Sequence, residues 1–82
     1  MNENALLSRI TSAPEILSGK PVIRGSRLSV EFILNLLAHR STHQEILSEY
    51  NDLQDEDIQA CLLFASRSLS SAYFMPLVAE TA

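Results

Sequence analysis

The chain has little cysteine, glycine or proline, and it has no tryptophan. Its 82 residues include one Cys, two Gly and three Pro. The single cysteine, Cys61, can form neither an intrachain disulfide nor a zinc site built from several cysteines. No stretch approaches the ~20 apolar residues of a membrane-spanning helix, and the first residues lack the basic flank of a secretory signal. We therefore expect a cytoplasmic protein without export or membrane insertion.

Basic residues are scarce in the second half of the chain. Residues 41–82 contain Arg67 alone against seven acidic residues, whereas residues 1–40 contain five basic residues against three acidic ones. The formal net charge of −4 conceals this division. Because nucleic acids and acidic protein surfaces attract positive charge, any anion-binding surface is expected in the first half.

The remaining composition is that of a small folded domain. Hydrophobic residues make up 46% and charged residues 20% of the chain, which supplies enough apolar surface to offset the entropy of chain ordering. A chain of this length has room for one core. We expect a single domain over residues 1–82.

The few turn-forming residues are concentrated before residue 26. Two of the three prolines and both glycines lie between Ser12 and Gly25, which favours short extended pieces joined by turns. Ile16-Leu17 and Val22-Ile23 are the candidate strands, with Ser18-Gly19-Lys20 as the loop between them. The pattern predicts a β-hairpin over about 14–25, which has to pack on helices or pair with another chain.

Three helices are predicted from hydrophobic periodicity, over about 29–39, 42–50 and 54–74. Ser29 is a plausible N-cap of the first, and Thr42 and Glu45 have the spacing of a capping box at the start of the second. The residues expected to face inward are Val30, Ile33, Leu34 and Leu37, then Ile46, Leu47 and Tyr50, then Ile58, Cys61, Leu62, Ala65 and Leu69. Phe32 and Leu36 lie off this stripe, so the first helix is central or lies in an interface.

The predicted fold is mainly α, a three-helix bundle preceded by a short hairpin. The short turn between the second and third helices resembles a helix-turn-helix arrangement. Beyond it, residues 76–82 form a tail. The apolar patch Ala72–Met75 has no place in a three-helix core, so it is expected to wrap around the bundle or to join subunits. The apolar tail Tyr73–Val78 is a second candidate contact for a partner.

The sequence resembles the short prokaryotic proteins of domain-of-unknown-function family 433. The likeness extends from Ile10 to about Phe74 and depends on the blocks Pro21–Val30, Glu45–Tyr50, Asp52-Leu53 and Glu56–Ala60. The usual Gly-Thr-Arg of the family is Gly25-Ser26-Arg27 here, and its usual Thr before the third helix is Gln54. The resemblance implies a homeodomain-like three-helix fold. It also implies a role as the antitoxin of a toxin–antitoxin pair, often beside a ribonuclease toxin of the PIN-like class.

The segment Arg24-Gly25-Ser26-Arg27 is the best candidate for a binding site. Two guanidinium groups beside a glycine can grip a phosphate or a carboxylate. In the alternative interpretation Gly25 makes the turn into the helix, Ser26 bonds local backbone, and the arginines pair with acids such as Glu31 or those of the third helix, which fixes the hairpin on the bundle. Both interpretations stay open. With Lys20 and Arg40, these residues form the predicted partner-binding or DNA-binding side.

The start of the third helix argues against base reading by that helix. Asp55, Glu56 and Asp57 would face the phosphates of both groove walls, and Arg67 lies about three turns away. Acids that stabilise the positive end of the helix dipole are the more ordinary explanation. If DNA binds, we expect the basic side described above to bind it, through a dimer that doubles the charge.

No catalytic or metal-binding pattern is visible in the sequence. His39 and His43 are four residues apart but are separated by the start of a new helix, and no third ligand accompanies them. Cys61 lies on a buried stripe without a basic neighbour, which is typical of a core residue. We expect a protein that is not an enzyme and that binds no metal and no cofactor.

The sequence leaves three hypotheses about function open. The leading hypothesis is an antitoxin-like binding module that occludes an acidic nuclease site with Arg24 or Arg27. The alternative is a DNA-binding transcriptional regulator that represses its own operon, and both can hold at once. The third is a purely structural homodimer with neither partner nor DNA affinity.

Overall fold

Residues 2–70, the part that the computed structural model describes, form a mainly α-helical domain. In chain order the elements are α1 (Glu3–Leu7), β1 (Ile10–Thr11), a short 3-10 turn (Leu17–Gly19), β2 (Val22–Ile23), α2 (Val30–Ala38), α3 (His43–Glu49) and α4 (Asp55–Ser70). Helices α2, α3 and α4 correspond to the three predicted helices, within one residue at each described end. The predicted extension of the third helix to 74 and the tail at 76–82 lie outside the described residues.

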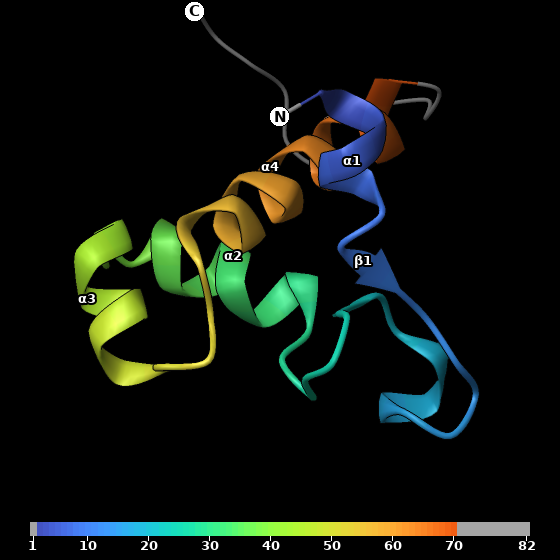
Figure 1. Ribbon diagram of the computed structural model, residues 1–82, viewed down its shortest axis with the longest axis horizontal. Helices are drawn as coiled ribbons and strands as arrows, with labels where there is room; N and C mark the ends of the chain where they lie inside the picture. Colours follow the sequence, from blue (N-terminus) through green and yellow to red (C-terminus); the bar gives the residue numbers. More distant parts are fainter. Residues whose placement is uncertain (1, 71–82) are drawn as a thin grey trace, which may run out of the picture.

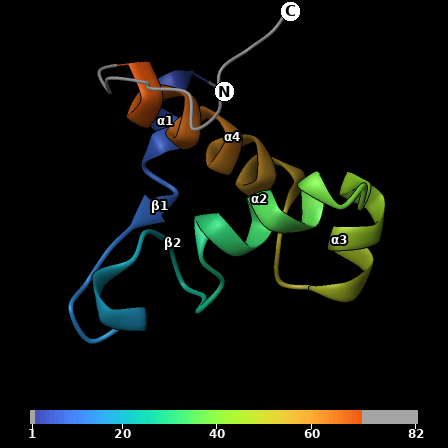
Figure 2. The ribbon, with the colours of Figure 1, turned by 180° about the vertical axis from the view of Figure 1, so that it is seen from behind.

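Helix α4 is the central element. It contacts α1, α2, α3 and β1, and Figures 1 and 2 show α1 lying against its C-terminal part while α2 and α3 lie towards the opposite end. The predicted fold class, a small helical bundle preceded by a two-stranded antiparallel hairpin, is confirmed. Within residues 2–70, no helix combines the length and the apolar character needed to cross a bilayer.

The starts of α2 and α3 are set by the side chains that the sequence predicted. The Ser29 hydroxyl accepts a hydrogen bond from the Phe32 N–H at 2.9 Å. At α3 the Thr42 hydroxyl accepts from the Glu45 N–H at 3.1 Å, and the Glu45 carboxylate accepts from the Thr42 N–H at 2.8 Å. These contacts satisfy N–H groups that have no partner within the helix.

Helix α4 starts at the predicted residue by a different contact. The Gln54 Oε1 accepts a hydrogen bond from the Arg9 guanidinium group at 3.1 Å, so this side chain does not cap the helix. Instead the Asp57 carboxylate accepts a hydrogen bond from the Gln54 main-chain N–H at 2.8 Å, which is half of a capping box. The missing Thr is thus compensated from inside the first turn.

The predicted first strand at Ile16-Leu17 is wrong. Val22-Ile23 is a strand, but it pairs antiparallel with Ile10–Thr11, in the register Ile10 with Ile23 and Thr11 with Val22. Leu17 and Ser18 take φ of +47° and +59°, a left-handed conformation that no strand accommodates. The hairpin therefore begins near residue 10, not 14, and the predicted loop Ser18–Lys20 belongs to a longer connection.

Sequence periodicity also missed α1, which has five residues. The Asn2 side chain caps it by accepting from the Ala5 N–H at 2.7 Å, and Glu3 pairs with Arg67 of α4. A single isolated turn of this kind is marginal in water, so packing on α4 explains its presence better than its own propensity.

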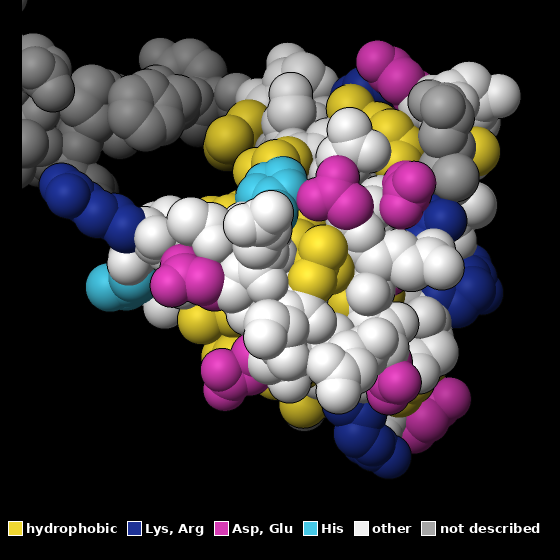
Figure 3. Space-filling model, turned by 60° about the vertical axis from the view of Figure 1, so that its left-hand side comes forward, with side chains coloured by type: hydrophobic (Ala, Val, Ile, Leu, Met, Phe, Trp, Pro, Cys, Tyr) yellow, Lys and Arg dark blue, Asp and Glu magenta, His cyan; other side chains and the backbone are white. Residues whose placement is uncertain are grey.

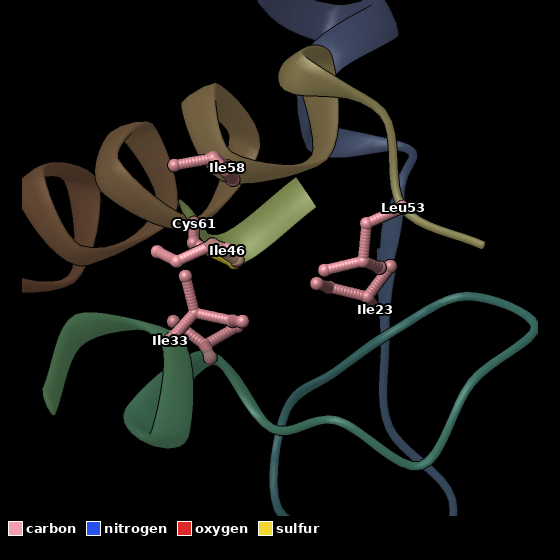
Figure 4. Close-up of a cluster of buried hydrophobic side chains, with 7 residues drawn as sticks. Ile23, Ile33, Ile46, Leu53, Ile58 and Cys61 are labelled. Carbon is pink, nitrogen blue, oxygen red and sulfur yellow. The ribbon is translucent and has the colours of Figure 1, made fainter. Parts of the chain in front are cut away.

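The core lies where α2, α3, α4 and β2 meet. Its fully buried side chains include Ile23, Ile33, Ile46, Ile58 and Cys61, and Leu53 from the α3–α4 turn lies beside Ile23 (Figure 4). The expected inward faces of α2 and α3 are confirmed as buried or as packed against this cluster. Two residues of the expected α4 stripe are not buried within the described chain, because Leu62 is 44% and Leu69 is 67% exposed.

Candidate partner-binding groove

The Arg24–Arg27 loop between β2 and α2 is closed by main-chain hydrogen bonds. The Ile23 N–H donates to the Leu28 carbonyl at 2.9 Å, and the Ser26 N–H donates to the Ile23 carbonyl at 3.0 Å. The Ser26 hydroxyl donates to that carbonyl at 2.8 Å and accepts from the Leu28 N–H at 3.1 Å. Ser26 thus bonds the local backbone, as the structural interpretation of this segment expected.

Gly25 serves the conformation of the same loop. Its φ is +81°, in the left-handed region that glycine adopts at little cost. A Cβ atom at this position would meet no atom within 4 Å. The backbone angle, and not close approach of a neighbour, accounts for the glycine.

The two arginines of the loop differ in their contacts. Arg24 donates from Nε to the Ser8 carbonyl at 2.9 Å, and its main-chain N–H donates to the Arg9 carbonyl at 2.7 Å, so it anchors the loop to the end of α1. Arg27 is exposed, and within residues 2–70 its side chain makes no hydrogen bond or ion pair. Its guanidinium group is available to a partner.

A groove of about 830 Å³ lies between this loop and the turn that joins α3 to α4. We call it the Arg27 groove. Its lining residues are Ile16, Gly25, Ser26, Arg27, Leu28, Glu49, Tyr50, Asn51, Asp52 and Leu53. It therefore brings together parts of two blocks that the sequence comparison singled out separately, the segments before α2 and after α3.

The α3–α4 wall of the groove is firmly held. Leu53 is 7% exposed and its N–H donates to the Tyr50 carbonyl at 3.0 Å. The Tyr50 ring packs edge-to-face on Phe32 of α2, with ring centroids 5.8 Å apart. Exposed Glu49 and Asp52 complete the wall, so the groove carries one cation and two anions above an apolar floor.

The other predicted basic residues lie elsewhere. Lys20 pairs with Glu31 at 3.0 Å, away from the Arg27 groove. Arg40 takes a φ of +72° just beyond α2, whose nine residues span ~13 Å between it and the Arg24–Arg27 loop. On the face shown in Figure 3, acidic side chains are scattered and basic ones lie near the margins. The structure brings together Arg24 to Arg27 but not Lys20 or Arg40.

Sequence reasoning overlooked Arg9, the most enclosed cation near the site. Its guanidinium donates to Asp57 at 3.0 Å, and the two side chains are only 24% and 10% exposed. The two carboxylate oxygens of Asp57 accept from Arg9 and from the Gln54 N–H. The predicted pairing of Arg24 and Arg27 with acidic side chains is wrong for residues 2–70, because Glu31 pairs with Lys20 and Asp57 of α4 pairs with Arg9. The 48-residue separation of Arg9 and Asp57 left no local signal for their pairing.

The first turn of α4 is less acidic towards solvent than its sequence suggests. Besides the Asp57 pair, His43 lies 2.8 Å from the Asp55 carboxylate. His39 instead contacts the Asn35 carbonyl at 2.8 Å, so the two histidines point to different partners. No group of three His, Cys, Asp or Glu side chains among residues 2–70 is arranged to hold a metal ion.

Cys61 is a core residue, as predicted. It is fully buried, and burial together with the nearby Asp57 charge raises the pKa of its thiol to about 12. At neutral pH the thiol is protonated, which removes the thiolate that nucleophilic chemistry requires.

The comparison with protein families decides where this chain belongs. The sequence profile of DUF433, described as a protein of unknown function, matches residues 10–65, which includes both walls of the Arg27 groove. The chain belongs to the DUF433 family. The expected family membership is thereby confirmed, while the DUF433 description itself assigns no activity.

A solved DUF433 structure has the same fold. The crystal structure of a DUF433 member protein from Anabaena variabilis ATCC 29413 is similar, with a TM-score of 0.73 and 22% sequence identity. The similar region covers 82% of this chain and 66% of that one. No curated protein matches the sequence.

Proposed function

We propose that this DUF433 protein is a non-enzymatic binding module, an antitoxin-like protein that neutralises a ribonuclease of the PIN-like class. The single observation that carries the proposal is Arg27, an exposed guanidinium on a hydrogen-bonded loop in a groove. The resemblance in its sequence supplies the class of partner.

Arg27 suits an acidic nuclease site because a guanidinium group can bond a carboxylate through two parallel N–H groups. Arg24 is the weaker candidate, since its Nε already donates to the Ser8 carbonyl. The closed loop reduces the conformational entropy lost when a partner binds. Glu49 and Asp52 across the groove favour a partner that carries basic residues around its acidic site.

The test is co-expression of this chain with the product of the adjacent reading frame. We expect the two proteins to co-purify and the chain to restore growth that the neighbour inhibits. Failure to bind or to detoxify either neighbouring product would remove the antitoxin proposal.

The second candidate is a DNA-binding regulator that uses α3, the turn and α4. The observation in its favour is the pairing of Asp57 with Arg9, which lowers the negative charge that opposes phosphates. In this proposal the protein acts as a homodimer, with Lys20, Arg24, Arg27 and Arg40 contacting the backbone.

A gel-shift titration against the chain's own promoter tests this candidate. Binding that weakens steeply with salt, and that is lost in the Arg24→Ala plus Arg27→Ala double variant, supports it. No shift at low salt eliminates it. Light scattering on the same sample shows whether the protein is a homodimer, as the DNA proposal requires.

A further inference from the structure

A second groove, of about 430 Å³, lies between α2 and α4. We call it the α2–α4 groove. Its lining residues are Lys20, Pro21, Val30, Glu31, Leu34, Phe64, Ala65, Ser68 and Leu69. Its floor is apolar, and the Lys20–Glu31 ion pair lies at its edge with both side chains more than half exposed. It contributes nothing to the Arg27 groove, with which it shares no residue.

The exposed side chain of Leu69 indicates that residues 2–70 leave this groove uncovered. The side chain is 67% exposed although it continues the stripe that Ile58, Cys61 and Ala65 begin. Removing an exposed leucine side chain from water is favourable, so a segment that covers Leu69 has a driving force to bind. Helix α1 packs on α4 through other residues and leaves this stripe open.

We propose that the α2–α4 groove binds the segment Tyr73–Val78 of the same chain. This segment, Tyr-Phe-Met-Pro-Leu-Val, has six consecutive apolar or aromatic residues and no charge. It begins four residues after Leu69, which already lines the groove. The apolar segment thus matches the apolar floor of the α2–α4 groove.

The length of the chain allows the contact. Phe64 to Leu69 extend ~7.5 Å along the helix axis, whereas the six residues Tyr73–Val78 reach ~20 Å when extended. The proposal requires the chain to reverse direction between Leu69 and Tyr73, in place of the helical continuation to residue 74 that the sequence pattern predicts. Val78 can therefore lie near the Pro21 end of the groove.

The same molecule is favoured over a second copy by effective concentration. A segment joined by a short flexible linker is present at its site at a concentration in the millimolar range. A second molecule at micromolar concentration competes poorly against it. Docking within the chain is therefore the expected state of the protein alone.

Paramagnetic relaxation in the full chain tests this proposal. A spin label is attached to Ala79→Cys, just beyond the segment, because Cys61 is fully buried and does not compete for the reagent. We expect strong broadening of the amide signals of Glu31, Leu34 and Ser68, and little broadening of Gln59, which does not line the groove.

Two leucines of α4 give a matched pair of variants. Leu69→Glu places a charge in the groove and is expected to restore the groove signals, whereas Leu62→Glu, at an exposed leucine outside the groove, should leave the broadening unchanged. Phe74→Glu should act as Leu69→Glu does, which covers the case of a folding defect at either site.

Three results would overturn the proposal. One is weak broadening throughout the groove, and another is broadening that survives both Leu69→Glu and Phe74→Glu. The third is broadening that appears equally in isotope-labelled molecules without a spin label when they are mixed with spin-labelled ones. That last result would assign the groove to a second copy of the chain.

Discussion

The two grooves of this protein are built from different kinds of backbone. The Arg27 groove lies between a loop and a turn, whose main-chain hydrogen bonds fix the backbone that carries Arg27 and Asp52. The α2–α4 groove lies between two helices, whose stripes give an apolar floor. The comparison teaches that the charged groove depends mainly on non-helical segments, while the apolar groove depends on the packing of two helices.

The largest loss of stability is expected for a substitution in the core that lies between the two grooves. Ile33 on α2 is fully buried in the core between them, so Ile33→Ala should leave a cavity and lower the free energy of unfolding by about 2–4 kcal/mol. Urea denaturation measures this, and both grooves should lose their structure together. The control Asn35→Ala, at an exposed position on the same helix, should change stability by less than about 0.5 kcal/mol. A loss below about 1 kcal/mol for Ile33→Ala would disprove the common core.

A smaller and more local effect is expected at the Arg9–Asp57 pair. Asp57→Ala leaves the Arg9 charge partly buried and the Gln54 N–H without an acceptor, next to the wall of the Arg27 groove. We expect a loss of about 2–3 kcal/mol in urea denaturation, less than the ~3–5 kcal/mol typical of a fully buried pair because Arg9 keeps some exposure. Asp55→Ala, which breaks an exposed contact to His43, should cost at most about 1 kcal/mol. Equal losses of stability in Asp57→Ala and Asp55→Ala would show that the Arg9–Asp57 pair stabilises the fold no more than the exposed Asp55–His43 contact does.

The smallest effect on stability is expected at Gly25. Gly25→Ala has room for the methyl group but must keep a φ of +81°, so we expect a loss of about 1 kcal/mol. Gly25→Asn, a residue that tolerates this conformation better, should lose less. Thermal denaturation of the two variants measures the difference. If alanine is tolerated as well as asparagine, the loop does not require the left-handed angle.

The helices could be predicted from sequence because their signals are local. Ser29 and the Thr42–Glu45 pair cap their helices through contacts three residues apart. The strand pairing could not be predicted in the same way, since Ile10 finds its partner thirteen residues away at Ile23. Competing hydrophobic residues at Ile16-Leu17 gave a shorter hairpin that the left-handed angles of this segment exclude.

Only part of the candidate site could be predicted from the sequence. The Arg24–Arg27 segment was recognised by its residue types, but the turn at Glu49–Leu53 stood out only through family resemblance and carried no assigned role. Only the fold brings the two together. The separation of Arg27 from Arg40 also depends on the direction of α2, so the sequence grouped cations that the structure disperses.

The central claim, that the Arg27 groove is the partner-binding site, is tested most directly by calorimetric titration with the neighbouring gene product that co-purifies with this chain in the co-expression test. Arg27→Ala should weaken binding by about 30-fold or more, a loss of at least about 2 kcal/mol for a charge pair removed from a desolvated contact. Arg40→Ala, an exposed arginine outside the groove, should change the affinity less than about twofold. Equal affinity of Arg27→Ala and the unmodified protein would contradict the account.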